Sequence, residues 1–220
     1  MFFLHALATR RKELTEQGDH DALKALPQVT VFERSSAPGG VWKSNRGESG
    51  QNITNMYDGL WINAPKELLE FPDYTFDSHF KTQMPAYLTR KEILKYIMAR
   101  VTQHEDIFEH VQFNTLVESA SYEESINQFV IKIKHSDGTT TTQYFDKCIW
   151  DGDRNDYPRK TPELDAKLSQ FQGPIIHSFE IGRVTDSVQG KRILMMGGSY
   201  SVEDLTLQYL KNGSHRRERL

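Results

Sequence analysis

This 220-residue sequence has a single cysteine, no large excess of one charge sign and no long apolar run. The single cysteine, Cys148, cannot close an intramolecular disulfide, form a CxxC redox pair or build a thiolate metal site. Lysine plus arginine number 27 and aspartate plus glutamate 30, so the formal net charge is −3. This balance gives no electrostatic reason for a nucleic acid or an anionic membrane as partner. We therefore expect neither dithiol chemistry nor nucleic-acid binding.

Signals for secretion, membrane insertion and metal binding are also missing. No run approaches the roughly 18 consecutive apolar residues that a membrane span needs. The opening MFFLHALA has no basic segment and is interrupted by His5, so it is too short for a signal peptide. None of the 8 histidines stands at a metal-ligand spacing such as HExxH. The sequence thus predicts a cytoplasmic protein with no transmembrane segment and no metal site.

The first third of the chain has the pattern of a helix followed by a strand. Apolar residues recur near helical spacing between Phe2 and Leu14, and a polar linker with Gly18 follows. The run VTVFE at 29–33 is predicted to be a buried strand that ends in the glycine-rich turn SSAPGG. The polar stretch from Lys43 to Asn55 is predicted to be a loop. A helix before a strand suggests an α/β unit.

The middle of the chain predicts a helix and a β-hairpin. Thr89 and Glu92 form a capping-box pattern, and the apolar residues behind them, including Ile93, Ile97 and Val101, keep helical spacing. Phe129, Ile131 and Ile133 alternate with Lys132 and Lys134, the turn HSDG follows, and residues 139–150 offer a returning strand.

The end of the chain repeats the succession of strand, glycine turn and helix. The run from Ile193 to Met196 is predicted to be a strand, and a Gly-Gly-Ser turn leads into a helix from about Val202 to Lys211, which Gly213 stops. Since similar signals occur at both ends, the chain suggests two nucleotide-type half-sites. The basic run HRRER at 215–219 is more simply a solvated terminus than a nucleic-acid tail.

Glu33 is the candidate ligand at the first of these turns. A carboxylate at a strand end can accept hydrogen bonds from both ribose hydroxyls of FAD or NAD, and it repels the 2′-phosphate of NADP. The glycines at 39 and 40 would let the backbone approach a pyrophosphate or a flavin. An ordinary strand-end acid beside turn glycines explains the same residues.

The second turn, GGSYS, has the geometry that points backbone N–H groups and a helix dipole at a phosphate. Of the three glycine positions in Gly-x-Gly-x-x-Gly, only Gly197 is a glycine, and the others hold Ser199 and Val202. The alternative is a capping box between Ser201 and Asp204 in an ordinary turn.

Read together, VFERSSAPGGVW, MYDGLWINAPKELLEFPDYTF, FQGPIIHS and ILMMGGSYSVEDL resemble the class B flavin-containing monooxygenases, and most closely their trimethylamine monooxygenase-like branch. The resemblance extends from about Val29 to Leu210, and the block at 56–80 is its most specific part. It implies an enzyme in which NADPH reduces FAD, O₂ adds to the flavin as a C4a-hydroperoxide, and an amine nitrogen or thioether sulfur takes the distal oxygen. The implied partners are a small-molecule substrate and O₂, and a homodimer is compatible with the family.

The resemblance also assigns roles to individual residues. It implies that Asn63 is the catalytic residue, whose amide hydrogen-bonds the cofactors and helps to hold the oxygenated flavin. The residues implied to bind FAD or to lie between flavin and nicotinamide are Glu33, Gly40, Val41, Trp42, Trp61, Asn63 and Val117. The second turn, implied to bind NADP(H), contributes Gly197, Ser199, Tyr200 and Ser201.

The expected fold is α/β, with a Rossmann-like FAD domain and an inserted Rossmann-like NADP domain that are both incomplete in this chain. Residues 1–150 would form the FAD-binding domain without its first strand and GxGxxG, and residues 151–220 the start of the NADP-binding domain. The chain also departs from the family at Ile181, where the signature beginning at Phe171 has an aromatic residue, and at Asp151. Two alternatives stay open: a two-dinucleotide flavoprotein reductase and a non-catalytic truncated remnant.

Overall fold

The computed structural model describes residues 2–43, 56–152, 160–181 and 188–213. The chain divides into two compact units, one made of Met1–Pro38 and Ile97–Gly152, the other of Gly39–Tyr96 and Asp153–Leu220. Almost all of the predicted loop from Lys43 to Asn55, and the basic run at 215–219, lie outside the described residues. Each unit is therefore considered by itself.

The first unit begins with helices α1 (Phe2–Gln17) and α2 (His20–Ala25). The predicted first helix is confirmed, and it buries Leu4, Leu7 and Leu14. Phe3, one of the apolar residues in this helix, is 46% exposed. The predicted linker after it contains α2, which the Asp19 side chain caps by accepting a hydrogen bond from the Ala22 N–H at 3.0 Å.

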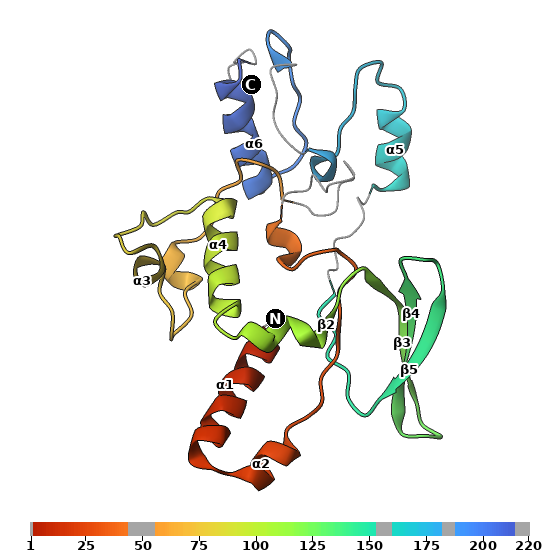
Figure 1. Ribbon diagram of the computed structural model, residues 1–220. Helices are drawn as coiled ribbons and strands as arrows, with labels where there is room; N and C mark the ends of the chain where they lie inside the picture. Colours follow the sequence, from red (N-terminus) through yellow and green to blue (C-terminus); the bar gives the residue numbers. More distant parts are fainter. Residues whose placement is uncertain (1, 44–55, 153–159, 182–187, 214–220) are drawn as a thin grey trace. The chain divides into compact units, whose positions relative to one another are not determined.

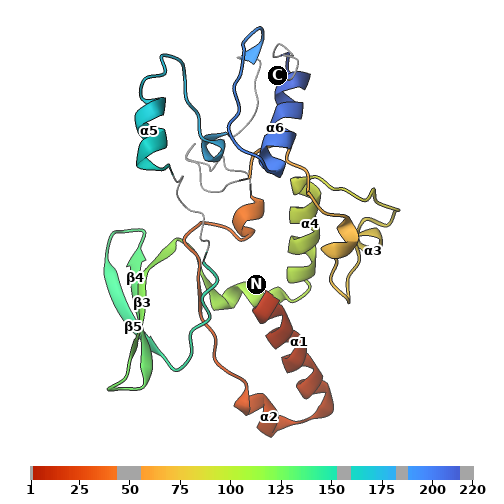
Figure 2. The ribbon, with the colours of Figure 1, turned by 180° about the vertical axis from the view of Figure 1, so that it is seen from behind.

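The strands of the first unit form a parallel pair and an antiparallel sheet (Figures 1 and 2). Strand β1 (Val31–Phe32) pairs in parallel with β2 (Val111–Gln112), which follows the 3₁₀ helix η3 (Glu105–His110). The predicted strand at 29–33 is therefore present but shorter and only half-buried. It is short because β2 has 2 residues and offers no further hydrogen-bond partner.

The antiparallel sheet has the order β3 (Thr115–Glu123), β4 (Gln128–His135), β5 (Thr140–Phe145). The predicted hairpin is β4 with β5, and its returning strand ends at Phe145 rather than Trp150. Strand β3 was not predicted, since most of its residues are exposed and its sequence TLVESASYE alternates only weakly. A separate core of Leu4, Val101 and Ile107 joins α1 to the parallel pair.

The second unit contains the 3₁₀ helices η1 (Gly40–Trp42) and η2 (Lys66–Leu68) and the helix α3 (Phe76–Phe80). Helix α4 (Arg90–Val101) begins here and continues into the first unit. Its predicted capping box is confirmed, because the Thr89 N–H and hydroxyl both donate to Glu92 Oε2 at 2.7 Å.

The C-terminal part of the second unit comprises α5 (Pro162–Leu168), the 3₁₀ helix η4 (Ser178–Glu180) and α6 (Tyr200–Lys211). The predicted last helix is confirmed, and Gly213 follows it with φ +87°. The predicted strand from Ile193 to Met196 is wrong: this run has no regular secondary structure, and Leu194 is 85% exposed. A strand needs a hydrogen-bonded neighbour, and none of the described strands pairs with this run.

Candidate functional site

Glu33 lies directly after β1, and the chain around Val111–Thr115 holds its backbone. Its N–H donates to the Gln112 carbonyl at 3.0 Å, and its carbonyl accepts from the Thr115 N–H at 2.9 Å. The carboxylate oxygen Oε1 accepts from the N–H and the hydroxyl of Ser35, at 2.8 and 2.6 Å. In the part of the chain that the structure describes, Oε2 has no hydrogen-bond partner. The carboxylate is thus oriented on one oxygen and can accept hydroxyl donors on the other.

Val117 belongs to the same unit as Glu33. It lies in β3, which is at the edge of its sheet and starts beside Glu33, where the Thr115 backbone bonds to it. The pairing with β4 shifts between Val117 and Ser119, which marks a β-bulge. Because a bulge bends a strand and leaves backbone groups outside the ladder, it suits a backbone contact to a ligand. The structure therefore brings Glu33 and Val117 near one another.

In the second unit, Arg90 holds the segment Gly40–Trp42. Arg90 is only 4% exposed; its Nη1 donates to the Trp42 carbonyl at 2.5 Å, and its Nη2 pairs with Asp58 Oδ1 at 3.1 Å. Gly40 has φ +50°, and among the described residues, its two chain neighbours aside, no heavy atom lies within 4 Å of the position that a Cβ would take. One buried guanidinium thus fixes a segment that has open space beside its backbone.

Trp61 and Asn63 point to the same exposed side of an extended segment. The Ile62 N–H donates to the Leu88 carbonyl at 3.0 Å, and the Arg90 N–H donates to the Leu60 carbonyl at 2.9 Å. Ile62 is buried at 6% exposure, Trp61 is 51% exposed and Asn63 is also exposed. Since successive side chains of an extended backbone point to opposite faces, burial of Ile62 turns the indole and the amide outward together.

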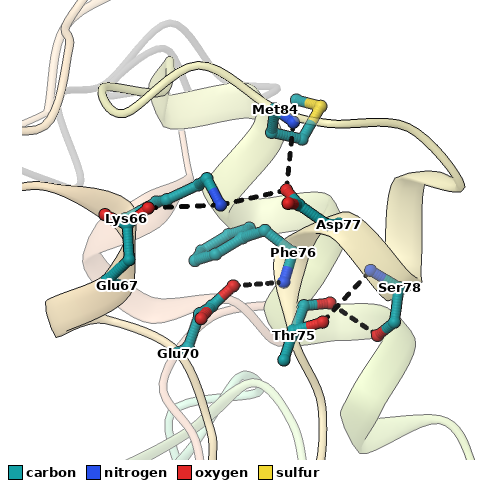
Figure 3. Close-up of polar contacts among 8 residues, drawn as sticks. All are labelled: Lys66, Glu67, Glu70, Thr75, Phe76, Asp77, Ser78 and Met84. Carbon is teal, nitrogen blue, oxygen red and sulfur yellow. Dashed lines mark hydrogen bonds and ion pairs between the residues drawn. The ribbon is translucent and has the colours of Figure 1, made fainter.

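Lys66 anchors the far end of this segment (Figure 3). Its N–H donates to the Ala86 carbonyl at 2.7 Å, and its buried ammonium lies 3.0 Å from Asp77 Oδ1 and 3.3 Å from Glu67 Oε1. The side-chain hydrogen bond to Asp77 raises the pKa of Lys66. A hydrogen bond from the Met84 N–H, followed by the Lys66 ammonium, lowers the pKa of Asp77. Both groups are therefore charged at neutral pH and fix the start of η2.

The second turn is exposed and leads into α6. Gly197 has φ +148°, and a Cβ there would lie 2.8 Å from Val202 Cγ2, so only glycine fits this approach to the helix. Ser199 is the N-cap residue, but no side chain caps the helix. The side chains of Ser199, Tyr200 and Ser201 are exposed. An uncapped helix N-terminus with hydroxyls around it can bind an anion.

The alternative capping box between Ser201 and Asp204 is not formed. Ser201 lies inside the helix rather than at its N-cap, and Asp204 accepts from Gln208 Nε2 at 3.1 Å and from the Tyr57 hydroxyl. The turn glycine and hydroxyls therefore do not serve a local cap.

The predicted site residues thus fall into three groups: one in the first unit, one in the second unit, and the turn before α6. Glu33 and Val117 lie together in the first unit, while Gly40, Val41, Trp42, Trp61 and Asn63 lie in the second unit around α4, and the turn Gly197–Ser201 precedes α6. Sequence reasoning missed Arg90 and Lys66, because the pairing of Arg90 with Trp42 and Asp58, and of Lys66 with Asp77, follows no local spacing. Within the described ranges, no group of three or more His, Cys, Asp or Glu side chains could hold a metal ion. Nor is any described helix long and apolar enough to cross a membrane.

Comparison with known proteins places this arrangement in context. The family model described as FMO-like, flavin-binding monooxygenase-like, matches residues 23–215. Trimethylamine monooxygenase of Pelagibacter sp. (strain HTCC7211) is 34% identical over 194 residues, which are 86% of this chain and 43% of the relative. Human flavin-containing monooxygenase 3 is 28% identical over 185 residues, covering 77% of this chain and 31% of the relative.

Among solved structures, the crystal structure of Tmm from the same Pelagibacter strain matches with a TM-score of 0.70 and 28% identity. The match covers 96% of this chain and 47% of that one. The predicted fold class, α/β with two partial dinucleotide-binding domains, is confirmed by this match. The chain spans less than half the length of the relatives it matches.

Proposed function

Because this chain belongs to the flavin-binding monooxygenase-like family, we propose that it acts in an FAD- and NADPH-dependent oxygenation of a soft nucleophile, an amine nitrogen or a thioether sulfur. One oxygen atom of O₂ would enter the product, the other would leave as water, and NADPH would supply the two electrons. The relative named for trimethylamine supports an amine nitrogen as the preferred acceptor.

Two features support FAD as a cofactor of residues 1–150. Glu33 offers an oriented carboxylate with Oε2 open to ribose hydroxyls, and its charge repels a 2′-phosphate. Gly40 leaves open space beside its backbone, next to Val41 and Trp42, which a flavin ring would need. Bound FAD would supply the activation of O₂, and the residues of this chain would bind and orient it.

NADP(H) suits the second turn, in residues 151–220, by the chemistry of its donors. Gly197 keeps the backbone close to α6, the helix N-terminus is uncapped, and the hydroxyls of Ser199, Tyr200 and Ser201 are exposed donors. Hydroxyl and backbone N–H donors at a helix N-terminus bind phosphate oxygens.

The single observation that carries the proposal is that the side chains of Trp61 and Asn63 are exposed on the same side of their segment. The buried Ile62 and the backbone bonds of Ile62 and Arg90 hold the indole and the amide on one exposed side. There the Asn63 amide would donate to a cofactor oxygen, which is the positioned electrostatic support that oxygen transfer needs. A homodimer and a cytoplasmic location remain predictions.

The test supplies the purified protein with FAD, NADPH and trimethylamine, and measures oxygenated product and NADPH consumption together. We expect Asn63→Ala to lower product while NADPH oxidation and H₂O₂ release continue, since a lost amide hydrogen bond costs about 0.5–1.5 kcal/mol and more where charge develops. Gln83→Ala, which also removes an exposed side-chain amide of the second unit, is the control. Unchanged product per NADPH in Asn63→Ala would remove this residue from the mechanism, and no oxygenation by the unaltered protein would contradict the proposed function.

A further inference from the structure

A buried tyrosine connects the segment before Trp61 to the helix after the second turn. Tyr57 is 3% exposed, and its hydroxyl donates to Asp204 Oδ2 on α6, 147 residues away in sequence. Tyr57 and Leu205 form one apolar cluster, against which Leu60 and Tyr209 pack. Burial and then the Asp204 carboxylate raise the pKa of Tyr57, so its hydroxyl keeps the proton that it donates. This contact is thus both apolar and charge-assisted.

Gln208 makes a second connection between the same two elements. Its Nε2 donates to the Gly59 carbonyl at 3.2 Å and to Asp204 Oδ2 at 3.1 Å. Gly59 has φ +86°, and a Cβ on it would lie 3.2 Å from Gln208 Oε1, which leaves little room between loop and helix. Because residues at i and i+4 share a helix face, Asp204 and Gln208 hold the loop from one side of α6.

The two connected elements carry the two halves of the candidate site that lie in this unit. The loop Tyr57–Gly59 leads directly into Trp61 and Asn63, and α6 begins at the turn Ser199–Ser201. A shift of the helix start therefore moves groups that are hydrogen-bonded to the loop.

We infer that Tyr57, Asp204 and Gln208 are positioning residues that couple occupation of the second turn to the placement of Trp61 and Asn63. This inference rests on the proposed NADP site. Binding of a nucleotide phosphate at the helix start orders α6, and the Tyr57–Asp204 and Gln208–Gly59 bonds pass that ordering to the loop. Hydrogen bonds and packed side chains that join two sites can carry such coupling, and these bonds form a continuous path from α6 to the loop.

Hydrogen exchange of the 220-residue protein, with and without NADP⁺, tests the coupling. In the unaltered protein we expect NADP⁺ to slow amide exchange at 200–204 and also at 57–62. In Tyr57→Phe and in Gln208→Ala, slowing should remain at 200–204 and be lost at 57–62. Without ligand, both variants should exchange about three- to tenfold faster at 57–62, the change expected when one net hydrogen bond is lost from a local opening equilibrium.

Tyr209→Phe is the matched control, because it also removes a hydroxyl from this cluster but has no hydrogen bond to Asp204. It should behave as the unaltered protein. Slowing at 200–204 alone in the unaltered protein, or unchanged ligand-free exchange in both variants, overturns the inference. If NADP⁺ slows exchange nowhere, the NADP site and the coupling both fail, and faster ligand-free exchange in Tyr57→Phe then shows that the contact itself is real.

Discussion

The Trp61–Asn63 segment and the Gly197–Ser201 turn both expose candidate cofactor ligands, yet they are held in different ways. The first has backbone bonds at both ends and two buried cations, Arg90 and Lys66, beside it. The second follows an irregular run in which Leu194 is 85% exposed, and it is held by α6, whose Thr206 hydroxyl donates to the Met195 sulfur at 3.1 Å. The difference shows that an exposed ligand can be fixed by buried charges or by one packed helix, and that each is vulnerable at a different residue.

Arg90→Met breaks the first arrangement and should have the largest effect. The substitution removes the hydrogen bonds that the Arg90 guanidinium donates to the Trp42 carbonyl and to Asp58 Oδ1. A hydrogen bond to a charged group contributes about 1.5–3 kcal/mol, and two are lost here, so the free energy of unfolding measured in urea should fall by about 3–5 kcal/mol. Arg10→Met, which removes an exposed pair with Glu13, should cost no more than about 1 kcal/mol. Equal effects would mean that Arg90 does not brace the segment.

Leu205→Ala tests the second arrangement. Leu205 is 5% exposed and packs against Tyr57, so its truncation should lower the free energy of unfolding by about 2–5 kcal/mol. Leu194→Ala, in the run wrongly predicted to be a strand, should change it by less than about 0.5 kcal/mol. A large cost at Leu194 would indicate that this run is packed after all, and would restore the predicted strand.

Two hydroxyl deletions compare the capping box formed at α4 with the start of α6, where no capping box is formed. Thr89→Ala removes the N-cap side chain of α4 and should cost about 1 kcal/mol in urea unfolding. Ser201→Ala removes a hydroxyl that caps nothing, and its cost should stay within about 0.5 kcal/mol. A cost at Ser201 that matches the cost at Thr89 would revive the capping-box interpretation of the second turn.

The Lys66–Asp77 pair gives the first region a pH dependence. The pKa of Asp77 is lowered from 3.8, so its contribution is complete above pH 3.8 and is lost as the pH falls through the folded-state pKa. The pKa of Lys66 is raised from 10.5, so its contribution is complete below pH 10.5 and is lost as the pH rises through the folded-state pKa. Asp77→Asn should remove part of the acid loss in a pH series of unfolding curves, whereas Asp21→Asn, in an exposed pair with Lys24, should not. If the free energy of unfolding falls equally at acid pH in Asp77→Asn and in the unaltered protein, the Lys66–Asp77 pair is not the source of this pH dependence.

Local sequence signals predicted local structure well. The capping box at Thr89, the hairpin of β4 and β5, and the helices α1 and α6 each depend on neighbours within one or two turns, and all are present. The run at Ile193–Met196 shows the limit, because its apolar residues favour a strand only where another strand supplies a ladder.

The candidate site divides in the same way. The candidate ligands Glu33, Trp61 and Asn63 were found through motifs, since a resemblance concerns residues that stand together in the sequence. The residues that hold them could not be found, because Arg90 reaches Trp42 and Tyr57 reaches Asp204 across long sequence separations. Only the folded chain brings such partners together.

The central claim, two turns for two different cofactors, is tested most directly by equilibrium binding of FAD and NADP⁺ to Glu33→Ala and Ser201→Leu. We expect Ser201→Leu to weaken NADP⁺ binding about tenfold or more and to leave FAD binding intact, and Glu33→Ala to do the reverse. Ser35→Ala, which removes the hydroxyl donor to Glu33 Oε1 but keeps the Ser35 N–H donor and the carboxylate, controls for the fold of the first turn. If Ser201→Leu instead abolishes FAD binding at unchanged folding stability, the assignment of the cofactors to the two turns is contradicted.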